Sequence, residues 1–195
     1  MIREKKGINL MLRKKIETKR LVLEPIQKKY FQDMYNLIKV NNADLSKWLP
    51  ISYPAKRKET YDFYKKAIID KNQVQYVIKN KESKAIMGGL GIMKNELNNN
   101  ATLGYWLAKE YRKKGYMTEA VQAVLHFCFM TEKLMRVEIT VHEKNTPSQG
   151  VIEKCHLKYE GTKRMAVRNG YKEYGNLRQY SILFFEWKKV ISHKV

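Results

Sequence analysis

A short cationic turn with a glycine lies between an apolar segment, residues 103–107, and a helix predicted over residues 114–130. Its members are Arg112, Lys113, Lys114 and Gly115. The first turn of a helix has main-chain N–H groups without intrahelical acceptors and the positive end of the helix dipole, so it favours an anion. A glycine lets the anion approach the main chain, and cationic side chains add charge-assisted hydrogen bonds. The turn is therefore predicted either to bind phosphate groups or to be a solvated basic helix start.

The spacing of this turn resembles a known motif. Arg112, Gly115 and Met117 match the Gln/Arg-x-x-Gly-x-Gly/Ala pyrophosphate loop of the GNAT superfamily of acyl-CoA N-acetyltransferases. The surrounding GYWLAKEYRKKGYMTEA is similar to its RimJ/RimL-like branch, which acetylates the N-termini of ribosomal proteins. Met117 stands where the family usually has a small residue. Because main-chain amides carry the anion, we expect the larger side chain to be tolerated, although it could crowd the loop.

Three further segments resemble the family in the same order, residues 18–25, 48–50 and 141–159. The last of these contains Asn145 and Ser148 at the spacing of the second family motif, although His-Leu replaces its usual Gly-Phe. The resemblance covers about residues 16–188. It implies a GNAT fold, in which the sheet is splayed between its two central strands.

The resemblance also implies acetyl-CoA as the acetyl donor. The strand predicted over residues 103–108 is expected to diverge from its neighbour after Trp106. This leaves main-chain groups of Leu107 and Ala108 for the pantetheine amides and the thioester oxygen. The diphosphate is expected at a set of loop residues, Arg112, Lys113, Lys114, Gly115, Tyr116, Met117 and Thr118. The Asn145 side chain is expected to hold either the splayed end of the sheet or the pantetheine arm.

Acyl transfer needs a donor for the leaving thiolate. In many relatives this is a tyrosine seven residues after the motif asparagine, but that position here is Ile152. In the ribosomal-protein branch a serine takes the role, and Ser148 matches it. The resemblance thus implies direct transfer without an acyl-enzyme, with Ser148 either donating to the thiolate or only capping its helix.

The base that removes the amine proton is less defined, because Thr102 occupies the place where relatives often have a glutamate. Glu138 is the first candidate, on the facing strand. Glu119 and His142 are alternatives, each with a structural interpretation, and deprotonation through water is another. Asn176 replaces an aspartate that is common near the last strand of relatives, which implies altered acceptor recognition.

The expected elements alternate along the chain. Strands are expected over residues 20–24, 74–79, 85–93, 103–108, 137–141, 158–165 and 180–186. Helices are expected over residues 28–39, 57–70, 114–130 and 148–155. This order predicts an α/β (α+β) fold with a mixed, mostly antiparallel sheet flanked by helices. We expect a basic N-terminal extension over residues 1–15 and one domain over residues 16–190.

The chain of 195 residues has a net charge of +20, from 39 Lys and Arg against 19 Asp and Glu. Such a charge suits a ribosomal RNA surface or an acidic protein, but a lysine-rich proteome would also produce it. Apolar runs are shorter than the roughly 18 residues of a membrane span, and the N-terminus is unlike a signal peptide, so a cytoplasmic protein is expected. Cys128 and Cys155 are expected to be reduced, and the histidine spacing predicts no metal site.

These observations together predict an acetyl-CoA-dependent N-acetyltransferase acting on a primary amine, with the N-terminal amine of a ribosomal or other protein favoured. The alternatives are a small-molecule amine or antibiotic acetyltransferase, and a non-catalytic RNA-associated protein on the same fold. Trp48, Leu49 and Pro50 are predicted either to form a wall of the acceptor pocket or to seal the fold. The family includes both monomers and homodimers.

Overall fold

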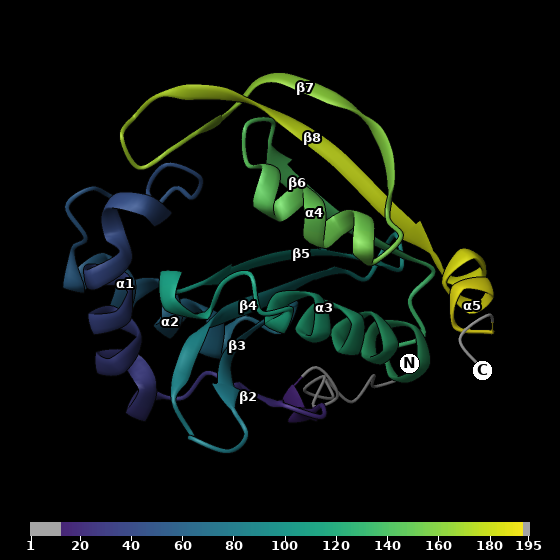
Figure 1. Ribbon diagram of the computed structural model, residues 1–195, viewed down its shortest axis with the longest axis horizontal. Coiled ribbons are helices and arrows are strands. Elements are labelled where there is room, and N and C mark those ends of the chain that lie inside the picture. Colours follow the sequence, from purple (N-terminus) through teal and green to yellow (C-terminus); the bar gives the residue numbers. More distant parts are fainter. Residues whose placement is uncertain (1–12, 193–195) are drawn as a thin grey trace, which may run out of the picture.

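The computed structural model describes residues 13–192, which build an eight-stranded sheet with the order β1-β2-β3-β4-β5-β6-β8-β7 (Figure 1). Its strands are β1 (Ile16–Glu17), β2 (Leu21–Pro25), β3 (Gln73–Asn80), β4 (Ile86–Asn95), β5 (Asn100–Leu107), β6 (Arg136–His142), β7 (Lys158–Arg168) and β8 (Tyr174–Leu183). Neighbouring strands are antiparallel except β5 and β6, which run parallel. The predicted mixed, mostly antiparallel sheet is confirmed.

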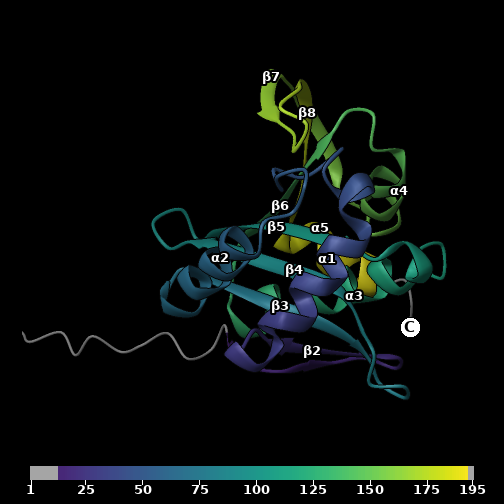
Figure 2. The ribbon, with the colours of Figure 1, turned by 90° about the vertical axis from the view of Figure 1, so that its left-hand side faces the viewer.

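Helices cover both faces of the sheet, as Figure 2 shows for α2 on one side and α3 on the other. The α-helices are α1 (Phe31–Leu45), α2 (Arg57–Ile69), α3 (Tyr116–His126), α4 (Thr146–Lys154) and α5 (Phe184–Ser192). Short turns of other types are the 3-10 segments η2 (Lys28–Tyr30) and η3 (Lys109–Tyr111), and the π-helical η4 (Phe127–Thr131). None of the helices within residues 13–192 is long and apolar enough to cross a membrane.

Alternation of side chains along β3 explains why two cores form. Val74, Tyr76 and Ile78 are buried in the larger core with residues of α3, α4 and α5. Val77 faces the opposite side and is buried with residues of α1 and α2. Because successive strand residues point to opposite faces, a strand covered on both sides has apolar residues on each face. Each such burial contributes on the order of 2 kcal/mol.

The two central strands diverge, and this opens the sheet at one end. Pairing between β5 and β6 runs from Asn100 opposite Arg136 to Leu103 opposite Ile139 and stops there. Beyond that point β5 stays with β4, and β6 stays with β8 as far as His142. The predicted split is therefore present, but the prediction that it begins after Trp106 is wrong, because each strand follows its other neighbour from an earlier residue.

The C-terminal end differs from the predicted strand over residues 180–186. β8 ends at Leu183 and α5 begins at Phe184. The Glu186 carboxylate accepts a hydrogen bond of 3.1 Å from the Leu183 N–H at this start. Trp187 then packs on the Phe129 ring, with centroids 5.3 Å apart. An aromatic-rich segment with strand propensity is thus helical because its rings pack in the core.

Other boundaries shift by a few residues. The first predicted helix extends to Leu45, α3 begins at Tyr116, and β1 was not predicted. Most of the predicted N-terminal extension, residues 1–12, lies outside the described residues. Arg13 donates to the main-chain oxygen of Asp70 at 3.1 Å, so the described part of the extension contacts the end of α2. The domain boundary at residue 15 stays a prediction.

Candidate functional site

Two left-handed residues shape the loop before α3. Lys113 has a φ of 60° and Gly115 a φ of 78°. Within residues 13–192, the main-chain N–H groups of residues 113–118 have no protein acceptor, and the first helical hydrogen bond runs from Glu119 N–H to Gly115 O at 3.0 Å. The loop therefore gathers a row of free donors at the positive end of the α3 dipole, which is an anion-binding arrangement.

Met117, at the unusual position of the motif, does not crowd this loop. Its side chain is 7% exposed and packs in the larger core. The main chain of Tyr116, Met117 and Thr118 still belongs to the row of donors. The expectation that a methionine is tolerated therefore has a structural reason, since the side chain points into the fold rather than toward the donors.

Arg20 supports the loop from a distant part of the sequence. Its Nη1 donates to Lys114 O at 3.0 Å, its Nε pairs with Glu119 Oε2 at 2.6 Å, and its guanidinium lies 4.4 Å from the Tyr116 ring centre. Glu119 also accepts from Thr18 Oγ1 at 2.6 Å. Burial alone would raise the pKa of Glu119, but these hydrogen bonds outweigh it and lower that pKa. Glu119 thus anchors the loop, as its structural interpretation predicted.

Arg112 is tied to the fold rather than to the row of donors. Its Nε donates to Leu107 O at 2.9 Å, and its Nη1 forms an ion pair with Asp44 in α1. Lys113 and Lys114, in contrast, have no ion-pair partner within residues 13–192. The two lysines are therefore the cations of this loop that remain available to an anion.

Main-chain groups at the end of β5 differ from the prediction. Ala108 N–H donates to Met87 O at 2.9 Å, and Leu107 O accepts from Arg112. Those two groups are used inside the fold. Because pairing with β6 ends at Leu103, the unpaired edge of β5 lies instead over residues 104–107. This edge is where an extended ligand could add its own amides.

Asn145 and Ser148 lie together at the start of α4. Asn145 is the N-cap residue, and its Oδ1 accepts from Ser148 N–H at 3.3 Å. Ser148 is therefore not the cap, and that alternative is wrong. Its hydroxyl lies 3.0 Å from the Tyr105 hydroxyl, across the opening between β5 and β6. Tyr105 was not singled out from the sequence, because nothing local relates it to Ser148.

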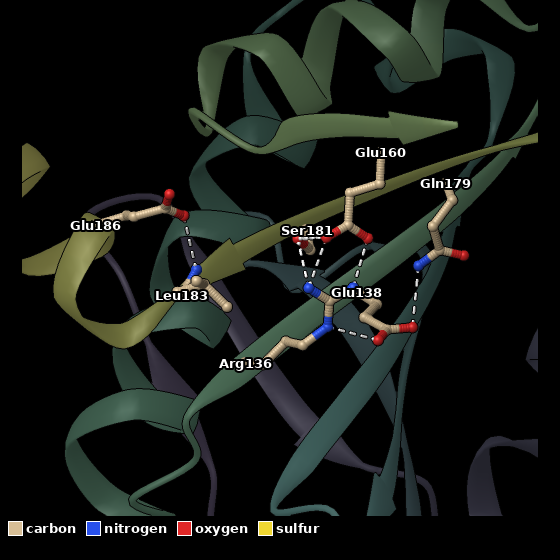
Figure 3. Close-up of polar contacts among 7 residues, drawn as sticks. All are labelled: Arg136, Glu138, Glu160, Gln179, Ser181, Leu183 and Glu186. Carbon is tan, nitrogen blue, oxygen red and sulfur yellow. Dashed lines mark hydrogen bonds and ion pairs between the residues drawn. The ribbon is translucent and has the colours of Figure 1, made fainter. Parts of the chain in front are cut away.

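Glu138 belongs to a polar network around Arg136 on the sheet face opposite Val137 and Ile139 (Figure 3). Arg136 donates to Glu138 at 2.7 Å and to Glu160 at 2.6 Å. The second Glu138 oxygen accepts from Gln179 Nε2 at 2.9 Å. The hydrogen bonds from Arg136 lower the pKa of Glu160 to about 2. The same guanidinium contacts both carboxylates, and both oxygens of Glu138 have partners.

A pocket of about 450 Å³ lies beyond the ends of β6 and α1. Its lining comprises Lys47, Trp48, His142, Glu143, Lys144, Asn169, Tyr171, Glu173, Tyr174 and Gly175. The rings of Trp48 and His142 meet edge to face, with centroids 5.6 Å apart. His142 Nδ1 accepts from Lys144 N–H at 3.2 Å, which places the hydrogen of the neutral ring on Nε2. The Nδ1 lone pair of His142 is thus engaged by the main chain.

The hairpin of β7 and β8 reaches the segment after α1 (Figure 1), and residues near its turn line the pocket. Gly170 N–H donates to Ser46 O at 2.8 Å, and a Cβ at Gly170 would lie 1.9 Å from Ile51 O. Tyr171 donates its hydroxyl to Ala43 O at 2.8 Å. In the same segment Trp48 lines the pocket while Leu49 packs against the smaller core. That residues 48–50 form a wall of the acceptor pocket stays a prediction.

Asn176, which replaces the family aspartate, holds two strands together. Its Nδ2 donates to Glu143 at 3.0 Å, and its Oδ1 accepts from Met165 N–H at 2.9 Å. Each side of the amide thus has a partner within the fold. Both cysteines, Cys128 and Cys155, are buried thiols that form no disulfide within residues 13–192. Within residues 13–192, no cluster of three or more His, Cys, Asp or Glu side chains could hold a metal ion.

A split sheet beside an anion-binding helix start is the arrangement of an acetyltransferase, and comparison with known proteins identifies which kind. Residues 20–158 match the acetyltransferase (GNAT) domain. The chain is 31% identical over 175 residues to "Putative ribosomal N-acetyltransferase YdaF" of Bacillus subtilis, covering 86% of this chain and 91% of that protein. The chain belongs to the GNAT family of N-acetyltransferases, in its RimJ/RimL-like branch.

Solved structures agree in fold. RimL, described as a ribosomal L7/L12 alpha-N-protein acetyltransferase in complex with coenzyme A, has a TM-score of 0.80 at 21% identity, over 87% of this chain and 98% of that one. Mycobacterium smegmatis RimJ in complex with CoA-disulfide has a TM-score of 0.82 at 18% identity, over 94% and 96%. The GNAT fold implied by the sequence is confirmed.

Proposed function

We propose that this protein transfers an acetyl group from acetyl-CoA directly to a primary amine on an acceptor. The observation that carries the proposal is the row of free N–H donors at residues 113–118, next to the unpaired edge of β5. Diphosphate binds such donors at a helix start, and Lys113 and Lys114 add charge. The similar RimL and RimJ structures, which contain coenzyme A or its disulfide, support this ligand.

The pantetheine arm then lies in the opening between β5 and β6. Its amides bind main-chain groups along residues 104–107, which have no strand partner beyond Leu103. This position directs the thioester toward the start of α4, where Asn145 and Ser148 lie. Hydrogen bonds between the pantetheine amides and the main chain of β5 follow the spacing of the strand and need no side chains. They therefore hold the thioester in position.

Transfer proceeds by attack of the neutral amine on the thioester carbonyl. The carbonyl oxygen gains charge and accepts a hydrogen bond from the β5 edge. When the intermediate collapses, the C–S bond breaks, its electron pair stays on sulfur, and the Ser148 hydroxyl donates a hydrogen bond to the thiolate. Both cysteines are buried within the fold, which is consistent with transfer that has no acyl-enzyme.

Glu138 is the proposed acceptor of the amine proton, directly or through water. It lies opposite Thr102 in the last paired stretch of β5 and β6, on the sheet face away from the larger core. Arg136 and Gln179 orient its carboxylate, as a base must be oriented before the reaction. The competing possibility is that water alone removes the proton.

The acceptor amine enters from the pocket beside the β7–β8 hairpin. Lys47 and Lys144 in its lining are balanced by Glu143 and Glu173, but the net charge of +20 on the whole chain disfavours polycationic small molecules. We therefore favour the N-terminal amine of a protein, and the similarity to a relative named for ribosomal acetylation supports a ribosomal one in the cytoplasm. The surplus charge of +20 suits docking to such a partner or its RNA.

Two measurements test the proposal. Calorimetric titration should show binding of acetyl-CoA that weakens as salt rises. Release of free coenzyme A thiol should then be followed with a panel containing peptides with free N-termini, polyamines and aminoglycosides. Turnover on peptides alone supports a protein acceptor, and turnover on the small amines alone identifies a metabolite or antibiotic enzyme. Salt-sensitive RNA binding without any turnover would reject the enzymatic proposal.

A further inference from the structure

Tyr105 and Ser148 form a contact that spans the split in the sheet. Tyr105 is on β5, past the last residue that pairs with β6, and Ser148 is in the first turn of α4. Their hydroxyl oxygens are 3.0 Å apart, and the Tyr105 oxygen is also 3.4 Å from Ser148 O. The proposed path of the thioester passes this contact.

The phenol of Tyr105 stays neutral. Burial raises its pKa above the ordinary value, although the hydrogen bond with Ser148 acts in the opposite direction. A neutral phenol keeps its O–H and can donate it. When Tyr105 donates to Ser148 Oγ, the serine hydrogen is free to point elsewhere, and the opening between β5 and β6 is the place that can receive it.

The main chain of Ser148 is fixed as well. Asn145 Oδ1 accepts from its N–H, and Pro147 lies in the same first helical turn. The serine is therefore held at two points, one from its own helix and one from β5. A side chain with both its main chain and its hydroxyl oriented loses little rotamer entropy when a ligand arrives.

We propose that Tyr105 is a positioning residue for acetyl transfer, which orients the Ser148 hydroxyl toward the thioester sulfur. This inference rests on the proposed function. No proton leaves Tyr105: the C–S electron pair goes to sulfur, the amine supplies the proton that finally protonates the thiolate, and Ser148 contributes a hydrogen bond. Position 152, where many relatives have a tyrosine, is isoleucine in this chain. The Tyr105 phenol on β5 instead supports the donor Ser148.

The experiment is a double-mutant cycle of Tyr105→Phe and Ser148→Ala, followed by coenzyme A release. Each single variant should lower kcat by about a hundredfold to a thousandfold, the range for loss of one preorganised donor. The Kd for acetyl-CoA should stay within about twofold, because diphosphate binding is unchanged. The double variant should be no slower than the slower single variant, since residues acting as one unit are not additive.

Two controls separate positioning from structural support. Tyr111→Phe removes a phenol that packs against the same core and has no hydroxyl hydrogen bond within residues 13–192, so kcat should not change. A 3-fluorotyrosine at position 105 keeps the O–H donor and should restore most of the kcat lost in Tyr105→Phe. Melting temperatures of all variants verify that they are folded.

The outcomes are distinct. An active wild-type protein with an unaffected Tyr105→Phe variant overturns this inference and leaves the proposed function standing. Losses that multiply in the double variant also overturn it, because the two residues then act separately. A wild-type protein that binds acetyl-CoA but acetylates no amine rejects the proposed function and this inference with it.

Discussion

The His142 ring occupies the space that a side chain at position 175 would need: a Cβ on Gly175 would lie 2.1 Å from His142 Nε2. Gly175 is on β8 at the start of the hairpin's return strand, and His142 ends β6. Because Trp48 packs edge to face on the same imidazole, this glycine sets the position of two pocket walls. Its small size is therefore part of the pocket's shape.

Substituting Gly175→Ala should displace His142 and Trp48 and weaken binding of the acceptor. We expect the KM for a peptide acceptor to rise about tenfold, a typical effect of misplacing binding groups, while the Kd for acetyl-CoA stays unchanged. Steady-state kinetics and calorimetry measure the two quantities. His142→Ala in the same chain should relieve the clash and recover the lost melting temperature. Equal weakening of acetyl-CoA binding would show that the pocket and the phosphate loop are not separate sites.

The Gly115 loop should be sensitive to any side chain. With a φ of 78°, Gly115→Ala adds left-handed strain of about 1–2 kcal/mol, although its Cβ would be an ordinary 3.4 Å from Arg20. Gly115→Val adds a branch that obstructs the anion. We expect acetyl-CoA affinity to fall about tenfold for alanine, the equivalent of 1.4 kcal/mol, and further for valine.

Gly150→Ala is the matched control for this loop, because a Cβ there meets no atom within 4 Å. Its position inside α4 should make alanine stabilising by about 0.5–1 kcal/mol, with acetyl-CoA affinity unchanged. Calorimetry on all three variants decides the case. Undiminished affinity in Gly115→Val would remove the phosphate loop from the proposed site.

Glu160 should make stability depend on acidic pH. The hydrogen bonds from Arg136 lower its folded pKa to about 2, from an ordinary value of 4.5. The carboxylate therefore stabilises the fold fully above about pH 4.5, and this contribution is lost as the pH falls toward 2. Melting temperatures should fall over that range less steeply in Glu160→Gln than in the wild-type protein. Parallel curves for the two proteins would contradict the ion pair.

Glu138 can be separated from Glu160 by kinetics. Glu138→Gln should lower kcat by about a hundredfold, the lower range for a general base, and change the acidic side of the pH–rate profile. Glu160 contacts the same guanidinium, and Glu160→Gln should have a much smaller effect on kcat. An unchanged rate in Glu138→Gln would identify water as the proton acceptor. Equal losses in both variants would indicate that the network only maintains the sheet.

Features that depend on local chain geometry were predictable from the sequence. The strand, cationic turn and helix around Gly115 are formed by residues within one segment, so their order follows from propensity and spacing. The resemblance to the GNAT family added the split sheet and the positions of Asn145 and Ser148. The C-terminal helix was missed because the apolar pattern of residues 180–186 suits either element.

The partners of these residues were decided only by the tertiary structure. Arg112 and Asp44 are 68 positions apart, and Tyr105 and Ser148 are 43 apart. Which side chains meet over such separations depends on how strands pair and where they diverge, and a single sequence carries no signal for it. The sequence determined by itself that a cationic turn with a glycine precedes a helix; packing decided which of its cations lack an ion-pair partner within residues 13–192, where the split begins, and which hydroxyl faces Ser148.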